Sequence, residues 1–365
     1  MSHHTITATA TARMGRTPED YKVLGIYPRL VKPWEDGLRT DGGPGSFEWW
    51  YFDAHLDDGA KLVVVFSTKE FTAIDRPLAP TVRIDLTLPD GTTVERHAEL
   101  DPKTFIAATD SCDVHIGGNL FSGDLHTYTI RAQVEDVRID ITLTGQVPAW
   151  RPETGYWYFG NEDDHYFAWL PSVPQGLVEA TYSVGERTST TTGIGYHDHN
   201  WGDTAMPKLM HHWYWARGAA GPYSVIASYI TAEKGYGYEA LPVFMLARDG
   251  ELIADDNANV SFEELGRYVD QETGKPVGNV TRYTYRDGDE RYVVTFTRFT
   301  DLTTVRMVDD LKGPQKIFAR LIGFDGAYLR FSGELRIDHY QGEKLVDSHT
   351  DDALWELMYF GKARP

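Results

Sequence analysis

Short runs of alternating apolar and polar residues dominate the chain. Residues 82–88 (VRIDLTL) and 137–143 (VRIDITL) alternate strictly, and 62–67, 293–299 and 328–337 are rich in β-branched and aromatic residues. This two-residue period is typical of half-buried strands. Asp-Gly dipeptides, which favour tight hairpin turns, follow or precede several of these runs. The pattern therefore predicts an all-β protein built from many antiparallel strands.

One segment favours a helix instead. In residues 260–268 (VSFEELGRY), Ser261 stands where an N-cap residue would, and Glu264 follows three residues later, as in a capping box. We expect one short helix here, in a chain that otherwise shows little helical periodicity.

The chain also repeats part of its own sequence. Residues 50–52 (WYF) and the apolar run 63–67 are matched, roughly 160 residues later, by 213–215 (WYW) and 225–229. A period of this length indicates a duplicated domain rather than a solenoid.

The length of the chain agrees with a duplication. At 365 residues it exceeds the size at which a single core usually stops growing. We expect two lipocalin-like β-barrel or sandwich domains, residues 18–205 and 206–365. A polar tail, residues 1–17, is expected to be disordered or to lie along the surface.

Composition narrows the possible partners. With 54 Asp and Glu against 35 Lys and Arg, the formal net charge is −19, which argues against nucleic acid or an anionic membrane surface as a partner. The chain has no apolar run long enough for a transmembrane helix and no apolar signal-peptide region near its start. A single cysteine, Cys112, makes no intramolecular disulfide. We therefore expect a cytoplasmic protein, and the charge is compatible with a monomer.

Aromatic residues are abundant and clustered. They make up 13% of the chain, which is compatible with a β-core or with a cavity for a large apolar ligand. The fingerprints of phosphate-binding loops, dinucleotide-binding turns, serine-hydrolase elbows and His-Glu-x-x-His zinc sites are missing from the sequence. We therefore expect an apolar small-molecule substrate and no cofactor.

The densest polar cluster is residues 195–203 (GYHDHNWGD). On a strand, His197 and His199 share one face, and Tyr196, Asp198 and Asn200 share the other. Three interpretations remain open. The two histidines could bind zinc with a third ligand from elsewhere, the segment could be a structural hydrogen-bonded junction, or it could hold a catalytic acid or donor beside an aromatic wall.

A second cluster, residues 46–53 (SFEWWYFD), places Glu48 on the same strand face as Trp50 and Phe52. A carboxylate among large apolar side chains is either a buried hydrogen-bond anchor or an acid with a raised pKa. A third cluster lines up His211, Trp213 and Trp215 on one face, where they form either core or a ligand wall.

These motifs resemble a known family. Residues 46–53, residues 195–202 (GYHDHNWG) and residues 355–362 (WELMYFGK) are similar to the signatures of the AttH/hydroxyneurosporene synthase family. The resemblance implies two lipocalin-like domains and chemistry on bulky apolar substrates without a nucleotide. Family members include carotenoid 1,2-hydratases, kievitone hydratase and cofactor-free cyclases that perform intramolecular [4+2] reactions on polyketides.

The resemblance implies a choice between hydration and cyclisation. In the family's carotenoid hydratases an acidic residue follows the His-Asn-Trp motif on the next strand, whereas residues 223–231 (YSVIASYIT) contain no acid. We therefore expect a cofactor-free cyclase or isomerase of a polyene or polyketide in natural product biosynthesis. A hydratase or dehydratase, a non-catalytic carrier of an apolar ligand and a zinc hydrolase remain as alternatives.

The same resemblance suggests the site residues. The expected catalytic residues are His199, Asp198, Tyr196 and Glu48. The expected cavity-lining residues, together with His211 as a binding residue, are Trp201, Trp50, Trp213, Trp215 and Tyr229. We expect no metal ligand among them.

Overall fold

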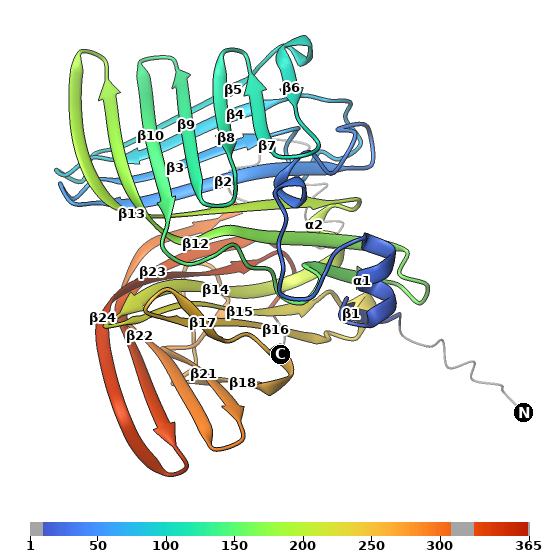
Figure 1. Cartoon of the computed structure of the whole chain (residues 1–365), viewed down its shortest axis with the longest axis vertical. Helices are drawn as coiled ribbons and strands as arrows, with labels where there is room; N and C mark the ends of the chain where they lie inside the picture. The colour runs from blue at the N-terminus through green and yellow to red at the C-terminus, as the bar shows by residue number, and fades with distance from the viewer. Residues whose placement is uncertain (1–9, 308–324, 364–365) are drawn as a thin grey trace, which may run out of the picture. The chain divides into compact units, whose positions relative to one another are not determined.

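The computed structural model describes residues 10–307 and 325–363 of the chain, which divides into two compact units (Figure 1). The N-terminal unit comprises Met14–Tyr158 and His165–Met206. Of the described residues, the C-terminal unit comprises 207–307 and 325–363 together with Phe159–Asp164 and 10–13. Of the expected tail, residues 1–9 lie outside the described residues, and Ala12–Met14 form strand β1, which pairs with β11.

The N-terminal unit is built on one curled antiparallel sheet. Its hydrogen-bonded order is β5-β4-β3-β2-β13-β12-β10-β9-β8-β7-β6, with β11 beside β12. The strands are β2 (Phe47–Leu56), β3 (Lys61–Ser67), β4 (Thr81–Thr87), β5 (Thr93–Glu99), β6 (Phe105–Ala107), β7 (Cys112–Ile116), β8 (Asn119–Gly123), β9 (Thr127–Val134), β10 (Val137–Gly145), β11 (Tyr156–Phe159), β12 (His165–Val184) and β13 (Arg187–Gly202). The helical turns are α1 (Pro18–Leu24), η1 (Pro33–Asp36) and η2 (Pro102–Thr104).

The C-terminal unit has a second antiparallel sheet, ordered β17-β16-β15-β14-β24-β23-β22-β21-β18, and a small ribbon of β19 and β20. Its strands are β14 (Met210–Ala220), β15 (Tyr223–Ala232), β16 (Ala240–Arg248), β17 (Glu251–Ala254), β18 (Val260–Leu265), β19 (Tyr268–Val269), β20 (Pro276–Val277), β21 (Val280–Asp287), β22 (Glu290–Arg306), β23 (Ala327–Gln341) and β24 (Lys344–Tyr359). Its short helical turns are η3 (Lys234–Tyr236) and η4 (Asn257–Asn259), and α2 (Met206–Leu209) lies where the two units join in sequence.

The two sheets follow the same connectivity. In the N-terminal unit β2 lies between β3 and β13, and in the C-terminal unit β14 lies between β15 and β24. The repeated motifs occupy these equivalent strands, because Trp50 lies on β2 and Trp213 lies on β14. The predicted all-β fold with a duplicated architecture is confirmed.

Alternation along the strands forms the core of each unit. On β4 the apolar residues Val82, Ile84 and Leu86 are fully buried, whereas the residues between them are partly exposed. A strand turns successive side chains to opposite faces, so each strand contributes one apolar face to the interior. The C-terminal unit is built in the same way, with Phe331 and Trp355 in its core.

The expected helix at residues 260–268 was wrong, because Val260–Leu265 form β18, paired with β21. Phe262 stacks on Tyr229 with ring centroids 4.1 Å apart and also contacts Tyr283. Val260 and Phe262 are two residues apart, so a strand directs both toward this aromatic cluster, as a helix would not. Pairing and packing therefore outweighed the capping pattern.

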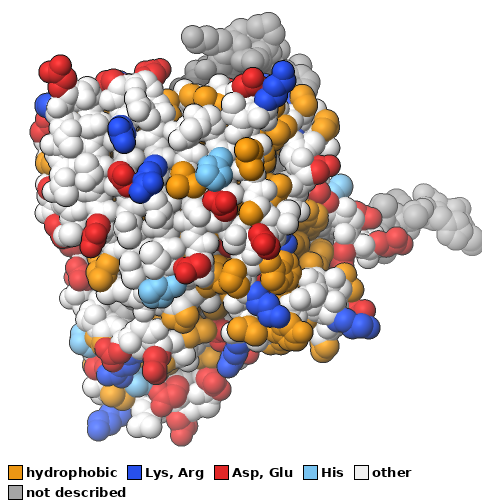
Figure 2. All heavy atoms as spheres, turned by 45° about the horizontal axis from the view of Figure 1, so that its top comes forward, with side chains coloured by type: hydrophobic (Ala, Val, Ile, Leu, Met, Phe, Trp, Pro, Cys, Tyr) orange, Lys and Arg blue, Asp and Glu red, His pale blue; other side chains and the backbone are white. Residues whose placement is uncertain are grey.

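Charged side chains are dispersed over the face of the described residues shown in Figure 2, with Lys and Arg set among Asp and Glu. Within the described part of the chain, no helix is long and apolar enough to cross a bilayer.

Candidate active site

Strand β13 presents its polar motif on two faces, as predicted. It pairs with β2 on one side, where His199 lies opposite Trp50 and Trp201 opposite Glu48. His197 and His199 belong to one face, and Asp198 forms its hydrogen bonds with residues on the other face. All of these side chains are buried, so each needs partners inside the protein.

On the first face, His199 lies between two carboxylates. Its Nε2 is 2.8 Å from Oε1 of Glu48, and its Nδ1 is 3.4 Å from Oδ1 of Asp36, at the end of η1. The backbone N–H groups of Arg39 and Thr40 also donate to Glu48, each at 2.7 Å. Glu48 is therefore a buried hydrogen-bond anchor that orients His199.

The charges of this array stabilise one another. Burial by itself disfavours the imidazolium, but the carboxylates of Asp36 and Glu48 outweigh it and raise the pKa of His199. Burial likewise opposes ionisation of Asp36, but His197 and His199 hold the pKa of that carboxyl well below its usual range. The His199 ring is packed between Trp50 and Trp201, with centroids 4.6 Å away in each case, which suits a cation.

His197 is held by the fold in the same interior. Its Nδ1 donates to the carbonyl of Tyr51 at 2.8 Å, and its Nε2 lies 3.2 Å from Oδ2 of Asp36. The hydroxyl of Tyr128 donates to the same carboxylate oxygen at 2.5 Å. Both ring nitrogens of His197 therefore already face protein oxygens.

One set of possible metal ligands lies here. One ligand atom each from Asp36, Cys112 and His197 lies within 4.8 Å of the others. Burial raises the pKa of the Cys112 thiol well above its ordinary value, and the thiol donates to the carbonyl of Phe121 at 3.7 Å. A thiolate ligand is disfavoured at this position, so the donor set does not fit zinc.

On the opposite face of β13, Asp198 collects three hydrogen bonds. Trp169 Nε1 and the hydroxyl of Tyr196 both donate to its Oδ2 at 2.7 Å, and Asn200 Nδ2 donates to its Oδ1 at 2.7 Å. Burial raises the pKa of Asp198 despite these donors. Asp198 thus fixes the indole of Trp169.

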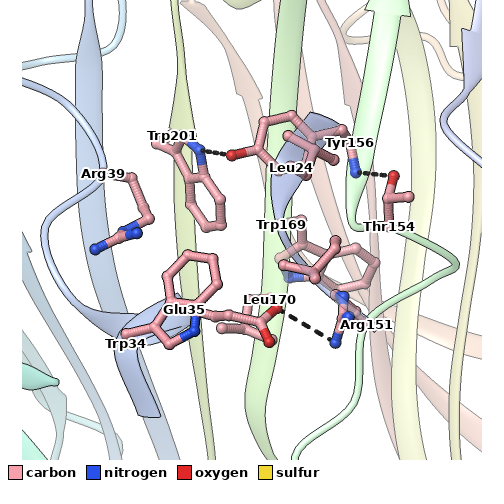
Figure 3. Close-up of a pocket in the computed structure, with 11 residues that line it drawn as sticks. Leu24, Trp34, Glu35, Arg39, Arg151, Thr154, Tyr156, Trp169, Leu170 and Trp201 are labelled. Carbon is pink, nitrogen blue, oxygen red and sulfur yellow. Dashed lines mark hydrogen bonds and ion pairs between the residues drawn. The ribbon is translucent and has the colours of Figure 1, made fainter. Parts of the chain in front are cut away.

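Two tryptophans that contact the β13 motif, Trp169 and Trp201, form walls of a pocket in the N-terminal unit (Figure 3). The pocket is partly open to solvent and narrow in this structure, because a water-sized sphere has only about 30 Å³ available to it. Aromatic side chains predominate among the larger residues of its lining. The lining residues are Leu24, Ile26, Trp34, Glu35, Arg39, Arg151, Thr154, Tyr156, Trp169, Leu170 and Trp201.

The residues expected to be catalytic lie behind this lining. His199 stacks on Trp201, and Asp198 holds Trp169 through its N–H group. Neither His199, Asp198, Tyr196 nor Glu48 is among the lining residues, whereas Trp201 is. The signature motif therefore holds the side chains of two lining tryptophans in place.

One wall of the pocket carries a buried ion pair. Glu35 and Arg151 lie 3.3 Å apart and are each more than nine-tenths buried (Figure 3). Arg151 also donates to the carbonyls of Leu30 and Tyr27. Burial raises the pKa of Glu35, although Arg151 opposes this shift.

Sequence reasoning missed several of these lining residues. Trp34 and Glu35 lie on η1, and Arg39 and Arg151 lie in connecting segments, where alternation carries no information. The available signal was the run Pro33–Asp36, which places an indole and two acids side by side outside any predicted strand. Tyr156 belongs to an aromatic run, but its role depends on its neighbours in space.

The remaining expected binding residues lie in the C-terminal unit. Trp213 contacts Phe360, and Tyr229 stacks on Phe262. Nε2 of His211 lies 2.8 Å from the carbonyl oxygen of Lys362. These residues and Trp215 do not line the pocket of the N-terminal unit, and Trp50 lies behind Trp201, across the ring of His199.

Replacing Asp198 with asparagine tests the positioning role. An amide has only one acceptor oxygen, so at least one of the three donors loses its partner, and we expect a loss of about 1–3 kcal/mol in the free energy of unfolding. Urea denaturation measures it, with Asp140→Asn at a half-exposed ion pair as the matched control. Equal stability of Asp198→Asn and wild type would contradict this role.

Comparison with known proteins identifies the family of the chain. A family model described as Diels-Alderase-like matches residues 43–300. The quinolone epoxide rearrangement protein asqO of Emericella nidulans is 27% identical over 215 residues, which are 53% of this chain and 56% of that protein. The Diels-Alderase ucsH of Acremonium sp is 24% identical over 369 residues and 88% of both chains. The chain therefore spans little more than half the length of the first of these relatives.

Solved structures share the fold. The crystal structure of CghA aligns with a TM-score of 0.63 at 14% identity, over 97% of this chain and 96% of the other. A putative AttH from Nitrosomonas europaea aligns with a TM-score of 0.59 at 16% identity, over 91% and 97%. The family match and these structures together confirm the resemblance inferred from the three sequence motifs.

Proposed function

The chain belongs to the Diels-Alderase-like family, and we propose that it is a cyclase or isomerase that closes or rearranges rings in an apolar polyene or polyketide intermediate without a redox cofactor. The observation that carries the proposal is the pocket whose aromatic walls, Trp169 and Trp201, are locked from behind by Asp198 and His199.

Such a pocket suits a reaction that depends on substrate conformation. An intramolecular cycloaddition needs its two reacting parts held face to face, and positioning alone can supply about 7–11 kcal/mol of the barrier at the upper end. A wall that shifts by an ångström would lose much of this effect. The buried hydrogen bond between Asp198 and Trp169 restricts that shift.

The polar part of the pocket would orient the substrate. Arg39 lies over the ring of Trp34 at 5.0 Å, and the Glu35–Arg151 pair adds a fixed donor and acceptor. A few polar groups in an aromatic lining are typical of small-molecule sites, where they set orientation and specificity.

The test is mass spectrometry of the purified protein with linear polyene and polyketide precursors in deuterated water. A cyclase that works by cycloaddition, or an isomerase that moves no proton, converts its substrate with no change of mass and no deuterium incorporated at carbon. Trp201→Leu should lower kcat/KM by about 10²-fold because it removes a wall, whereas Trp213→Leu, the matched change in the C-terminal unit, should have little effect. Loss of activity only in Trp213→Leu would place the site elsewhere.

Hydration or dehydration is a second candidate, favoured by Glu35. It is a carboxyl with a pKa raised by burial in an aromatic-lined pocket, and protonating an alkene requires such an acid beside π faces that stabilise a cation. A product heavier by one D₂O would support this candidate. Unchanged substrate that co-purifies with the protein would instead identify a carrier.

A further inference from the structure

We propose that the hydroxyl group of Tyr156 is a catalytic hydrogen-bond donor, which polarises a neutral oxygen of the bound substrate, either a carbonyl or an epoxide oxygen. The inference rests on the proposed function, because it assigns the group that activates the substrate in the same pocket.

The position of Tyr156 is fixed on several sides. Its ring stacks on Tyr158 with centroids 6.0 Å apart, contacts Tyr166 at 5.4 Å and meets Trp201 edge-on at 5.5 Å. Its backbone N–H is bonded to the hydroxyl oxygen of Thr154, another lining residue (Figure 3). A side chain held in this way can present its hydroxyl group without reorganising.

The hydroxyl group has an unused proton. Trp201 Nε1 donates to its oxygen at 3.1 Å, as Figure 3 shows. A phenol also carries one donor of its own, and within residues 10–307 and 325–363 that proton has no acceptor at hydrogen-bond distance. The arrangement leaves one donor to offer to a ligand in the pocket.

The neighbours of Tyr156 make it a better donor and keep it neutral. Accepting the indole N–H strengthens the hydrogen bond that the same hydroxyl can donate. Burial raises the pKa of the phenol to about 12, so it stays protonated across the physiological range and does not act as a base. Such a donor can bind a carbonyl or an epoxide oxygen without giving up its proton.

This role connects the signature motif with chemistry. Glu48 orients His199, the ring of His199 packs on Trp201, and the indole of Trp201 donates to Tyr156. A hydrogen bond to a carbonyl conjugated with the reacting alkene withdraws electrons and lowers the cycloaddition barrier, and the same bond to an epoxide weakens its C–O bond. In both cases no atom is transferred to the protein.

The first experiment needs no turnover. The conjugated enone 4-phenyl-3-buten-2-one, labelled with ¹³C at its carbonyl, is bound to the full chain, and its carbonyl stretch is measured by infrared spectroscopy. We expect a shift to lower frequency with wild type, loss of that shift in Tyr156→Phe, and binding about 3- to 10-fold weaker. In the second part of the experiment, styrene oxide competes with the enone for the pocket. If styrene oxide competes less well in Tyr156→Phe than in wild type, the Tyr156 hydroxyl group also donates to epoxide oxygens.

Tyr158→Phe is the matched control, because it removes a phenol from the adjacent stacked ring that does not line the pocket. The control should keep the infrared shift. If neither probe binds wild type at millimolar concentration, or if Tyr156→Phe keeps both shift and affinity, the proposal is overturned.

Turnover separates this proposal from the proposed function. With a substrate that the protein converts, Tyr156→Phe should lower kcat by about 10²-fold and raise KM by no more than about 3- to 10-fold, the loss expected for ground-state binding. Incorporating 3-fluorotyrosine at position 156, a stronger donor of similar shape, should restore kcat, which a merely structural role would not require. An infrared shift in wild type without conversion of any substrate would support Tyr156 as a hydrogen-bond donor and contradict the proposed cyclase function.

Discussion

Replacing His199 with phenylalanine will lower the free energy of unfolding by about 3–5 kcal/mol, because it leaves the buried Glu48 carboxylate without its cation and leaves Asp36 with His197 as its one histidine partner. Asp36 and Glu48 are each no more than 1% exposed, so water cannot take over the role of the imidazolium. Phenylalanine keeps the stack between Trp50 and Trp201, so the loss reports charge rather than packing. Urea denaturation at constant pH measures the difference.

The pH dependence of stability should change in the same variant. The folded-state pKa of His199 is raised above its unfolded value near 6.5, so its stabilising contribution is complete below that pH and is lost as pH rises through the folded pKa. The pKa of Asp36 is lowered, so its contribution is complete above about pH 4 and is lost only in stronger acid. Wild type should therefore lose stability on the alkaline side, whereas His199→Phe should be flat there.

A suitable control is His97→Phe, since His97 is half-exposed and its ion pair with Glu70 is on the surface. We expect a change within about 0.5 kcal/mol for this substitution. If stability depends on pH in the same way in wild type and in His199→Phe, the imidazolium does not stabilise the buried carboxylates of Asp36 and Glu48.

Breaking the ion pair in the pocket should lower the free energy of unfolding almost as much as His199→Phe does. The loss should depend on which of the two partners is replaced. Glu35→Gln leaves the Arg151 cation buried and should cost about 3–5 kcal/mol. Arg151→Met should cost less, because Glu35 can bind a proton and become neutral. Its stability should then rise as pH falls, since the pKa of a buried unpaired carboxyl lies above its unfolded value.

The double variant Glu35→Gln with Arg151→Met completes the test. Removing both charges leaves no uncompensated ion, so the double variant should be more stable than Glu35→Gln alone. The comparison uses urea denaturation midpoints at equal slope. If the losses from the single changes simply add, the two side chains do not interact as the 3.3 Å contact implies.

What the sequence could predict depended on periodicity. Alternation predicted the strands, and it placed His197 and His199 on the face opposite Asp198 because a strand allows no other arrangement. It also placed Glu48 on the face of Trp50 and Phe52, where a buried hydrogen-bond anchor was one of the two interpretations. Asp36 was missed, because a carboxylate on a helical turn between strands acquires its role only from the long-range pairing that brings β13 beside β2.

The duplication itself obscured the site. Trp213 on β14 repeats the pattern of Trp50 on β2, so the sequence suggests equal roles for both. The structure distinguishes them by their neighbours, because His199 lies opposite Trp50 and Met358 lies opposite Trp213. No local pattern shows which strand will pair with which.

Because of that difference in cross-strand partners, the two copies of the repeat tolerate substitution to different degrees. In the copy that contains Trp50, substitution is limited by the need to balance buried charges, so changes there must be concerted. In the copy that contains Trp213, the thioether of Met358 demands only volume and apolarity, which many side chains supply. The C-terminal copy is thus the one in which drift can accumulate, and a library of apolar exchanges at Met358 should retain more folded members than one at His199.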